Sequence, residues 1–384
     1  MTHDVIIIGA GPAGSTAAIE FARQGRVVAL VEKEEFPRRK VCGEFISAAN
    51  IPIMRRLGIE DDWRSRAGPE IRKLALYASG RMITAPMPGR DSFGRALGRD
   101  VFDTLLRDTA KQEGADLYQP CRAVALRQTA DGHELALETA GGDKRKLSAP
   151  VVIAAHGSWE RTTLSTRLPK STGPKDLLGF KAHFRNATLS EDTMPLLAFP
   201  GGYGGIVWAD DGRLSLSCCI RSEALGSLRQ QHGGLAAEVV LAHMLSSCRG
   251  VREVLDGAAL SGAWLATGSV RPAIRARYQD QIYRIGNLAG EAHPVIAEGI
   301  SMAIQSATLL ASLLEGVDMR DAAARDAAGH RYAAAWLRRF GPRLHVSRSV
   351  AWMASRPKAF SGIAALVEAV PRLLTVGAGL SGKA

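Results

Sequence analysis

The sequence predicts an α/β fold in which a Rossmann-like dinucleotide-binding domain is interleaved with a mixed β-sheet substrate domain and followed by a helical C-terminal tail. Three observations predict it. The segment DVIIIGAGPAGSTAAIEFARQG joins an apolar run to a glycine turn and a helical pattern. Alternating apolar and polar stretches, typical of β-strands, fill the middle of the chain. The end of the chain is helical in pattern and rich in arginine.

The N-terminal unit is predicted to be a strand, a glycine turn, a helix and a second strand. An apolar strand at 5–8 leads into the turn, and the helix stops at Gly25. The second strand ends at Glu32, which is placed to accept hydrogen bonds from an adenosine ribose. The turn glycines let the backbone approach a pyrophosphate at the helix N-terminus. These glycines are Gly9, Gly11 and Gly14.

Later elements follow from the same patterns. We expect a helix at 47–57, short mixed strands after it, and a helix in GRDVFDTLLRDTAKQEG. Three alternating stretches then predict a β-meander that returns to a strand at 151–155. Further strands between 179 and 266 are interrupted by one helical stretch near 235–247. A strand, a long loop and a helix follow in YRIGNLAGEAHPVIAEGISMAIQSATLLASLL.

These elements divide the chain into three regions, because the dinucleotide-binding domain is interrupted by the substrate domain. The ranges are residues 1–75, 95–178 and 267–315 for the dinucleotide-binding domain, 76–94 and 179–266 for the substrate domain, and 316–384 for the helical, basic C-terminal region.

The composition indicates a globular protein. The chain has 384 residues, of which 46% are hydrophobic, and no apolar run approaches the ~20 residues of a membrane span. Asp4 stands directly before the first strand, which leaves no room for a signal peptide, so we expect a cytoplasmic protein. The five cysteines lack any CxxC or Cys/His ligand spacing, so free thiols are expected and a metal site is not.

Three separated segments together resemble one family. GAGPAG with Glu32, GRDVFDTLL, and GNLAGEAHPVIAEGISMAI are similar to the FAD-dependent oxidoreductases of the para-hydroxybenzoate-hydroxylase superfamily. KVCGEF and GGYGG look most like the geranylgeranyl-reductase branch, whose members carry a Lys-x-Cys-Gly motif beside the flavin. The resemblance covers roughly residues 4–315 and implies FAD as cofactor, with NAD(P)H as the electron donor.

The resemblance also implies a set of FAD contacts. Arg99 would contact FAD from the start of its helix, with Arg95 as a nearby competitor. Small residues late in the chain would face the ribityl chain and pyrophosphate, and a helix N-terminus would face the isoalloxazine. The expected cofactor-binding residues are Gly9, Gly11, Pro12, Ala13, Gly14, Glu32, Lys33, Lys40, Cys42, Arg99, Val124, Gly157, Gly286, Asn287, Gly290, Pro294, Gly299 and Ile300.

Two positions depart from the family pattern. Asn287 stands where the family usually has an aspartate that accepts a ribityl hydroxyl, so this contact should be weaker without the charge. Ala155-His156-Gly157 replaces the common Ala-Asp-Gly triplet. His156 could then lie beside the cofactor, although a hydrogen bond within a turn is the interpretation we favour.

Two residues are the candidates for a catalytic role. Cys42 would lie near the reacting face of the flavin, as a polarisable wall, a proton donor to the substrate, or a plain small residue. Lys40, Arg38 and Arg39 would favour its thiolate and Glu44 would oppose it. Tyr203, in PGGYGG, would lie in the substrate pocket, although an ordinary turn tyrosine is nearly as well supported.

Function remains open between several classes. We predict reduction or dehydrogenation of an unsaturated, lipophilic or carrier-bound small molecule. Aromatic hydroxylation is the alternative. A halogenase is disfavoured because the Trp-x-Trp-x-Ile-Pro segment typical of those enzymes is absent from the sequence. A flavin-folded protein that only binds a membrane or an acidic carrier is the non-enzymatic alternative.

The C-terminal region suggests a partner. From 320 onwards it holds eleven Lys or Arg and three acidic residues, a net +8, mixed with large apolar residues. This mixture suits a helical surface that binds an acidic carrier protein or, peripherally, an anionic membrane. Apolar residues that cap the substrate domain, with arginines facing water, would explain it as well. No motif supports nucleic-acid binding. The apolar residues are Trp336, Leu337, Phe340, Leu344, Trp352, Phe360 and Leu366.

Overall fold

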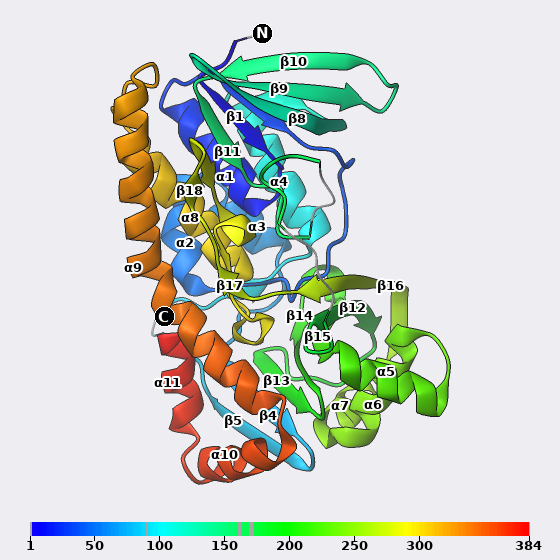
Figure 1. Cartoon of the computed structure of the whole chain (residues 1–384). Helices are drawn as coiled ribbons and strands as arrows, with labels where there is room; N and C mark the ends of the chain where they lie inside the picture. The colour runs from blue at the N-terminus through cyan, green and yellow to red at the C-terminus, as the bar shows by residue number, and fades with distance from the viewer. Residues whose placement is uncertain (1, 90, 160–162, 169–172, 384) are drawn as a thin grey trace.

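The computed structural model describes residues 2–89, 91–159, 163–168 and 173–383. Two large sheets occupy opposite ends of the molecule, and the long C-terminal helix runs along one side (Figure 1). The six-stranded sheet contains the N-terminal unit, and the seven-stranded sheet contains most strands from the middle of the chain. The predicted fold class is therefore confirmed.

The six-stranded sheet has the order β18-β19-β11-β1-β2-β7. Its pairings are parallel, apart from that of the edge strand β18. The strands β1, β2 and β11 are buried over their whole length, as expected for a parallel sheet covered on both faces. The strands are β1 (Val5–Ile8), β2 (Val28–Val31), β7 (Asp116–Tyr118), β11 (Val151–Ala154), β18 (Tyr278–Gln279) and β19 (Ile282–Arg284).

Alternate residues of β1 face two different layers. Val5 and Ile7 share a core with the helices α1 (Pro12–Arg23), α4 (Arg99–Gln112) and α8 (Gly299–Leu314). Ile6 and Ile8 pack against Leu135, Leu137 and Leu147 of the predicted β-meander. This period of two residues is what places a strand between two layers. The meander consists of β8 (Cys121–Thr129), β9 (Gly132–Thr139) and β10 (Lys144–Ala149).

The seven-stranded sheet has the order β16-β12-β15-β14-β13-β4-β5. It is antiparallel except where β13 pairs with β4. The strands are β4 (Lys73–Ala78), β5 (Arg81–Pro86), β12 (Leu177–Arg185), β13 (Thr193–Phe199), β14 (Gly202–Trp208), β15 (Leu214–Arg221) and β16 (Ala259–Val270). Two small ribbons pair β3 (Phe45–Ile46) with β6 (Arg95–Ala96), and β17 (Ala273–Ile274) with β20 (Gly290–Glu291).

The strands of this sheet extend beyond the ranges predicted for the substrate domain. They span 73–86 and 177–270, whereas the sequence pattern suggested 76–94 and 179–266. Pairing with neighbours distant in the sequence sets these ends, which local alternation does not reveal. The division of the whole chain into domains stays a proposal.

Two predictions of local structure were wrong. The single helix expected near 235–247 is one of three, α5 (Ser222–His232), α6 (Ala236–Ser247) and α7 (Arg249–Leu255). The short mixed strands expected after 57 begin instead with the helix α3 (Glu60–Arg66), which follows α2 (Ile51–Arg56). α3 and α7 have seven residues each, too few for apolar periodicity to show, and their stability comes from packing of Trp63 and Val251 into the two cores.

The C-terminal region is helical, as expected, and contributes to the core. α9 (Ala322–Ala354) begins at Asp321, whose side chain accepts hydrogen bonds from two backbone amides. Trp336, Phe340 and Leu344 of α9 are buried in the core that contains α1 and α8. α10 (Pro357–Ala369) and α11 (Arg372–Leu380) then pack on β4 and β5. Among the described helices, none is long and apolar enough to cross a membrane.

Candidate cofactor and substrate site

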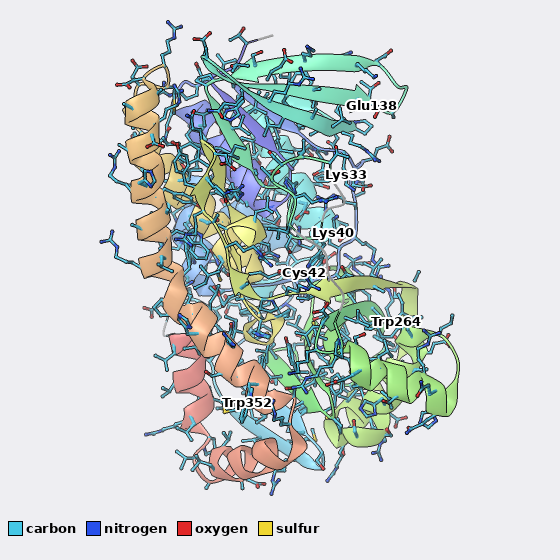
Figure 2. The ribbon with its side chains drawn as sticks, viewed as in Figure 1. Lys33, Lys40, Cys42, Glu138, Trp264 and Trp352 are labelled. Carbon is cyan, nitrogen blue, oxygen red and sulfur yellow. The ribbon has the colours of Figure 1, made fainter. Side chains whose placement is uncertain are left out.

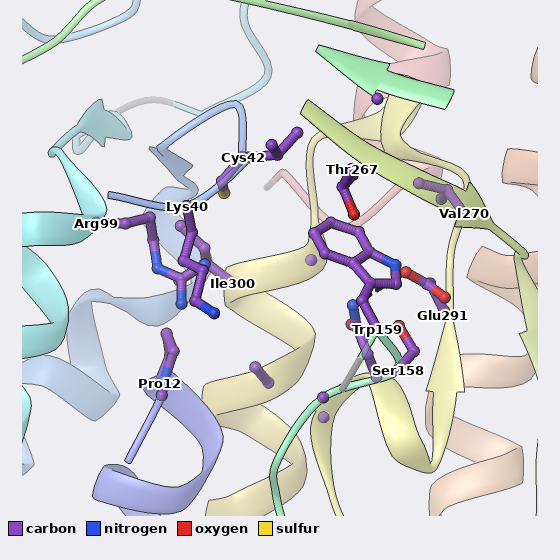
Figure 3. Close-up of a pocket in the computed structure, with 18 of the residues that line it drawn as sticks. Pro12, Lys40, Cys42, Arg99, Ser158, Trp159, Thr267, Val270, Glu291 and Ile300 are labelled. Carbon is purple, nitrogen blue, oxygen red and sulfur yellow. Dashed lines mark hydrogen bonds between the residues drawn. The ribbon is translucent and has the colours of Figure 1, made fainter. Parts of the chain in front are cut away.

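A cavity of about 880 Å³ is lined from both large sheets. Every residue that the sequence predicted for the site lines it, except Gly14 and Gly290. Lys33, Lys40 and Cys42 follow one another along its rim and wall (Figure 2). Figure 3 shows Pro12, Lys40, Cys42, Arg99 and Ile300 on one side, and Ser158, Trp159, Thr267, Val270 and Glu291 on the other. Segments distant in the sequence thus meet at one site.

Gly14 and Gly290 serve packing instead of the cavity. A Cβ on Gly14 would lie 1.8 Å from the carbonyl oxygen of Gly9, so this glycine lets α1 pack against the turn before it. A Cβ on Gly290 would lie 2.3 Å from the ring of Trp336, so this glycine makes room for α9. The predicted approach of Gly290 to the cofactor is replaced by this contact with Trp336.

The glycine turn forms a cradle for an anion. Gly9 has φ +105°, and a Cβ there would lie 2.7 Å from the Cα of His156. α1 begins after Gly11 without a side-chain cap and without an acidic residue in its first turn. Gly11, Pro12 and Ala13 line the cavity. The partial positive charge at this helix N-terminus therefore faces the space where a pyrophosphate would fit.

Glu32 and Arg99 flank this cradle. Glu32 is buried and accepts hydrogen bonds from the amides of Ala10 and Glu34, both at 2.9 Å. Arg99 binds Asp103 through Nε at 2.6 Å and Nη2 at 2.8 Å. Burial opposes the charge on Arg99, but Asp103 raises the pKa of the guanidinium above its usual value. Arg95 pairs with Glu70 outside the cavity lining, which distinguishes it from Arg99.

Asn287 and His156 keep polar atoms at the cavity. Asn287 Nδ2 donates to Glu291 Oε1 at 3.1 Å, which leaves its amide oxygen as an acceptor. His156 Nε2 lies 2.8 Å from Thr166 Oγ1, and burial lowers the pKa of His156 to about 4. The partner Thr166 is ten residues further along the chain, so this bond is not the bond within a turn that we favoured, and His156 lines the cavity as well.

A second helix N-terminus also meets the cavity. α8 starts after Glu298 without a side-chain cap on its own amides and without an acidic residue in its first turn. Pro294, Gly299 and Ile300 line the cavity around this start. Two uncapped helix N-termini around one space suit a cofactor that carries negative charge at two places.

Cys42 accepts hydrogen bonds at its sulfur and at its backbone carbonyl oxygen. The amide of Glu44 donates to Cys42 Sγ at 3.4 Å, and Lys181 Nζ donates to the carbonyl oxygen of Cys42 at 2.9 Å. Two of the cations expected to favour the thiolate are engaged elsewhere. Arg38 pairs with Glu32 and Asp103, and Arg39 donates to His183 and to the carbonyl of Ala263.

Sequence reasoning missed a buried charged network behind Cys42. Glu44, with φ +64°, forms an ion pair with Lys181, and His183 Nε2 donates to Glu44 Oε2 at 2.8 Å. Burial alone would raise the pKa of Glu44, but Lys181 and His183 hold it well below its usual value. Burial lowers the pKa of Lys181. The network joins the loop at 38–44 to β12. Its signal in the sequence was that Lys181 and His183, two residues apart in LGFKAHF, lie on the same face of a strand that is otherwise mainly apolar.

Tyr203 has a partner that the sequence did not indicate. Its hydroxyl lies 3.1 Å from His293 Nδ1, and both residues line the cavity. Burial raises the pKa of Tyr203 well above its usual value. Burial also lowers the pKa of His293 to about 4, with a further contribution from Arg348. Both side chains are therefore neutral at pH 7.

The wall around Tyr203 is mainly apolar. Glu291, beside it, pairs with Arg275 at 3.0 Å, and burial raises the pKa of this carboxyl. The apolar residues that line the cavity from the sheet face of Tyr203 are Met194, Leu196, Val207, Leu265 and Val270. This part of the cavity therefore suits a lipophilic molecule.

The comparison with known families identifies the cofactor. A family model described as an FAD-binding domain matches residues 2–226. This chain belongs to the FAD-binding domain family. The glycine turn and both helix N-termini described above fit FAD, and the chain is an FAD-dependent oxidoreductase.

Members of two reductase families are related to this FAD-binding chain. A digeranylgeranylglycerophospholipid reductase of Methanothermobacter thermautotrophicus is 28% identical over 307 residues, which is 77% of this chain and 73% of the relative. A menaquinone reductase of Mycobacterium tuberculosis is 26% identical over 339 residues, which is 82% and 77% of the two chains. The predicted resemblance to the geranylgeranyl-reductase branch is confirmed.

The fold recurs in a solved structure. A myxobacterial chondrochloren halogenase superposes with a TM-score of 0.77 at 20% identity, over 97% of this chain and 92% of that chain. At this identity the superposition supports the shared fold and leaves the reaction to be argued from the site.

Proposed function

We propose that this FAD-dependent oxidoreductase reduces an unsaturated, lipophilic substrate. The observation that carries the proposal is the set of apolar lining side chains on the sheet face that also carries Tyr203, whose hydroxyl lies beside His293. Cys42 lines the same cavity (Figure 3). We propose further that FAD is held by the predicted cofactor-binding residues that line the cavity.

FAD, once reduced by NAD(P)H or by a partner reductase, supplies the hydride in such a reaction. The chain has to supply the rest. Saturation of one carbon–carbon double bond takes one hydride at one carbon and one proton at the other. The second carbon becomes strongly basic, so even a phenol with a raised pKa can protonate it.

Tyr203 is our candidate for the proton donor. Its neutral state at pH 7 is the state that donates. When the neutral imidazole of His293 donates from Nδ1 to the phenol oxygen, the phenol hydrogen is directed away from His293. The apolar lining limits the access of water, which would otherwise compete with Tyr203 as the source of the proton. Cys42 is the alternative donor, and its sulfur also shapes the pocket.

The two reductase relatives described above favour reduction, although a squalene epoxidase of Arabidopsis thaliana is also related, at 22% identity over 81% of this chain. Both of the sequence relatives described above are named as reductases. Aromatic hydroxylation is the competing function, and a halogenase is disfavoured by the absence of a Trp-x-Trp-x-Ile-Pro segment from the sequence. Oxygen distinguishes these reactions, because a hydroxylase or halogenase consumes it and a reductase does not.

An anaerobic reaction tests the proposal. Holoenzyme reduced with one equivalent of dithionite is mixed with digeranylgeranylglycerophospholipid, the molecule named by one of the relatives, whose reducible groups are carbon–carbon double bonds. We expect substrate-dependent reoxidation of the flavin without oxygen, and a product that has gained two hydrogens. Tyr203→Phe should slow this step by about 100-fold, the usual contribution of a positioned acid.

The control variant is Tyr278→Phe, because the Tyr278 hydroxyl binds Asp326 at 3.0 Å and lies outside the cavity lining. It should react like the wild-type protein. A strict requirement for oxygen, with an oxygen atom found in the product, would replace the proposal with the hydroxylase alternative.

We also propose that the C-terminal region docks this cytoplasmic protein peripherally on an anionic membrane. Leu373, Val376 and Leu380 are exposed on one side of α11. Trp352, near the end of α9 (Figure 2), is exposed as well, and the guanidinium of Arg356 lies 4.2 Å from the centre of its ring. Exposed apolar side chains beside arginines suit an anionic lipid surface better than an acidic carrier protein, whose contacts would be mainly charged. Phe360 was part of the original pattern, but its side chain lies outside the described residues.

A further inference from the structure

After α11, the chain inserts a lysine next to the helix that begins at the FAD cavity. Lys383 Nζ lies 2.8 Å from Glu298 Oε1, and the two side chains are 3% and 0% exposed. The same ammonium donates to the carbonyl oxygen of Ile296 and lies 5.2 Å from the centre of the Phe45 ring. Phe45 lines the cavity, as does Ala297 between the two bonded residues. A single side chain thus contacts several parts of the cavity wall from behind.

The C-terminal cap of α11 orients the backbone of Lys383. The amide of Lys383 donates to the carbonyl oxygen of Ala378 at 3.2 Å, and that of Gly382 to Gly379 at 3.0 Å. Together with φ +97° at Gly382, these bonds form a Schellman motif at the end of α11. The residue after the glycine in this motif commonly packs back with an apolar side chain. Here that residue is a lysine, and its charge is buried with Glu298.

Glu298 needs this partner. It precedes the first residue of α8, yet its carboxylate accepts no hydrogen bond from the amides of that helix. Burial raises the pKa of Glu298, and Lys383 opposes this by favouring the charged form. A buried carboxylate that loses its cation is strongly destabilised, and it either takes up a proton or moves toward water. Either change would disturb the turn at 294–299, which lines the cavity.

A second contact holds the same segment against α8. A Cβ on Gly382 would lie 2.6 Å from the guanidinium carbon of Arg343. Arg343 in turn donates to Gln305 Oε1 at 3.0 Å, and Gln305 is a buried residue of α8. The segment that carries Lys383 therefore packs closely against residues bound to the cofactor helix.

We propose that Lys383 is a positioning residue for FAD: through Glu298 and Ile296 it fixes the turn at the start of α8, whose backbone faces the cofactor. The inference rests on FAD binding alone and holds whichever substrate is reduced. Its failure would leave the proposed reaction untouched, because the two are measured separately.

The test is the release of FAD from the Lys383→Met holoenzyme. Methionine keeps the length of the side chain and removes the charge, so Glu298 loses its cation. We expect FAD to dissociate about tenfold faster on dilution, followed by its fluorescence, and the visible spectrum of the bound flavin to change. Addition of Glu298→Gln to this variant should restore much of the retention, because a neutral amide no longer needs the ammonium.

The matched control is Arg81→Met. It removes an ion pair of 2.9 Å with Glu368 that also attaches the C-terminal region, but at an exposed place away from the cavity. FAD release should stay at the wild-type rate. A wild-type rate and spectrum in Lys383→Met, or equal losses in both variants, would overturn the proposal. If Lys383→Met does not fold, Glu298→Gln decides. It removes the carboxylate through which Lys383 acts and leaves the buried ammonium without its anion, so FAD should again dissociate faster, and unchanged FAD release there overturns the proposal.

Discussion

At the scale of single residues, burial determines which side chains carry charge. Glu44 and Glu298 are both buried, and each is paired with a buried lysine from a distant part of the chain. The half-buried His156 has no carboxylate hydrogen-bonded to it among the described contacts, and its neutral form is favoured. The first arrangement stabilises charges behind the cavity, whereas the second leaves a neutral hydrogen-bonding group in its wall.

The neutral state of His156 predicts a dependence of stability on pH. The pKa of His156 falls from 6.5 to about 4 in the folded protein, because of burial. Above pH 6.5 the folded and unfolded states are both neutral at this residue. As the pH falls from 6.5 to 4, the unfolded state binds a proton and the folded state does not, so the free energy of unfolding decreases by up to about 1.4 kcal/mol per pH unit.

Urea unfolding of FAD-free protein at about pH 7.5 and pH 5 measures this effect. The decrease in stability between the two pH values should be smaller in His156→Gln than in the wild type. His330→Gln is the control, because His330 is 74% exposed, and it should keep the wild-type decrease. Equal decreases in all three proteins would contradict the assignment.

At the scale of elements, Gly11 and Gly14 look equivalent in the sequence but have different roles. Gly14 packs against the turn at Gly9, whereas Gly11 does not. Gly14→Ala places a Cβ 1.8 Å from a backbone oxygen, so the helix has to move. We expect a loss of about 1–3 kcal/mol in unfolding free energy even without FAD. Gly11→Ala has its nearest neighbour at 3.8 Å, in the flexible side chain of Arg99. It should therefore leave the FAD-free protein as stable as the wild type and weaken only FAD binding.

Thermal unfolding of the FAD-free variants, combined with FAD titration, distinguishes these outcomes. The same loss of melting temperature in both variants would show that Gly11 is also a packing residue. That result would remove the distinction between a glycine that faces the cofactor and one that faces the strand.

At the scale of the whole molecule, the C-terminal region is both core and surface. Trp336 and Phe340 belong to the main core, so removal of the whole region should unfold the protein and cannot test membrane binding. Substitutions of exposed side chains can test membrane binding without unfolding the protein. The triple variant of Leu373, Val376 and Leu380 to serine should lose binding to phosphatidylglycerol vesicles, measured by co-sedimentation.

The control is a triple variant that removes three exposed apolar side chains outside the C-terminal region. Val27, Leu235 and Leu260 are exposed outside the C-terminal region, and their change to serine should leave vesicle binding intact. Binding of the wild type should weaken between about 0.1 M and 1 M salt, because screening shortens the reach of the arginine charges from about 10 Å to about 3 Å. Equal binding by both triple variants, or none by the wild type, would exclude this docking surface.

The sequence by itself determined the features that short segments encode. The glycine turn, the buried strand before it and the acidic residue after it are contiguous, so their pattern predicted a dinucleotide site and the resemblance that identified FAD. The family motifs quoted above also predicted a set of cofactor-binding residues, most of which line the cavity, and their contact with FAD stays a prediction. The helices α3, α5 and α7 were missed because they are short or weakly periodic and are stabilised by packing.

Only the tertiary structure decided which groups meet. Lys181 and Glu44, Tyr203 and His293, and Lys383 and Glu298 are separated by long stretches of chain. Their contacts depend on the register of the seven-stranded sheet and on the course of the C-terminal helices, which no local pattern encodes. A buried charge or hydroxyl is stable only with its partner in place, so the chemistry of this cavity is a property of the folded chain.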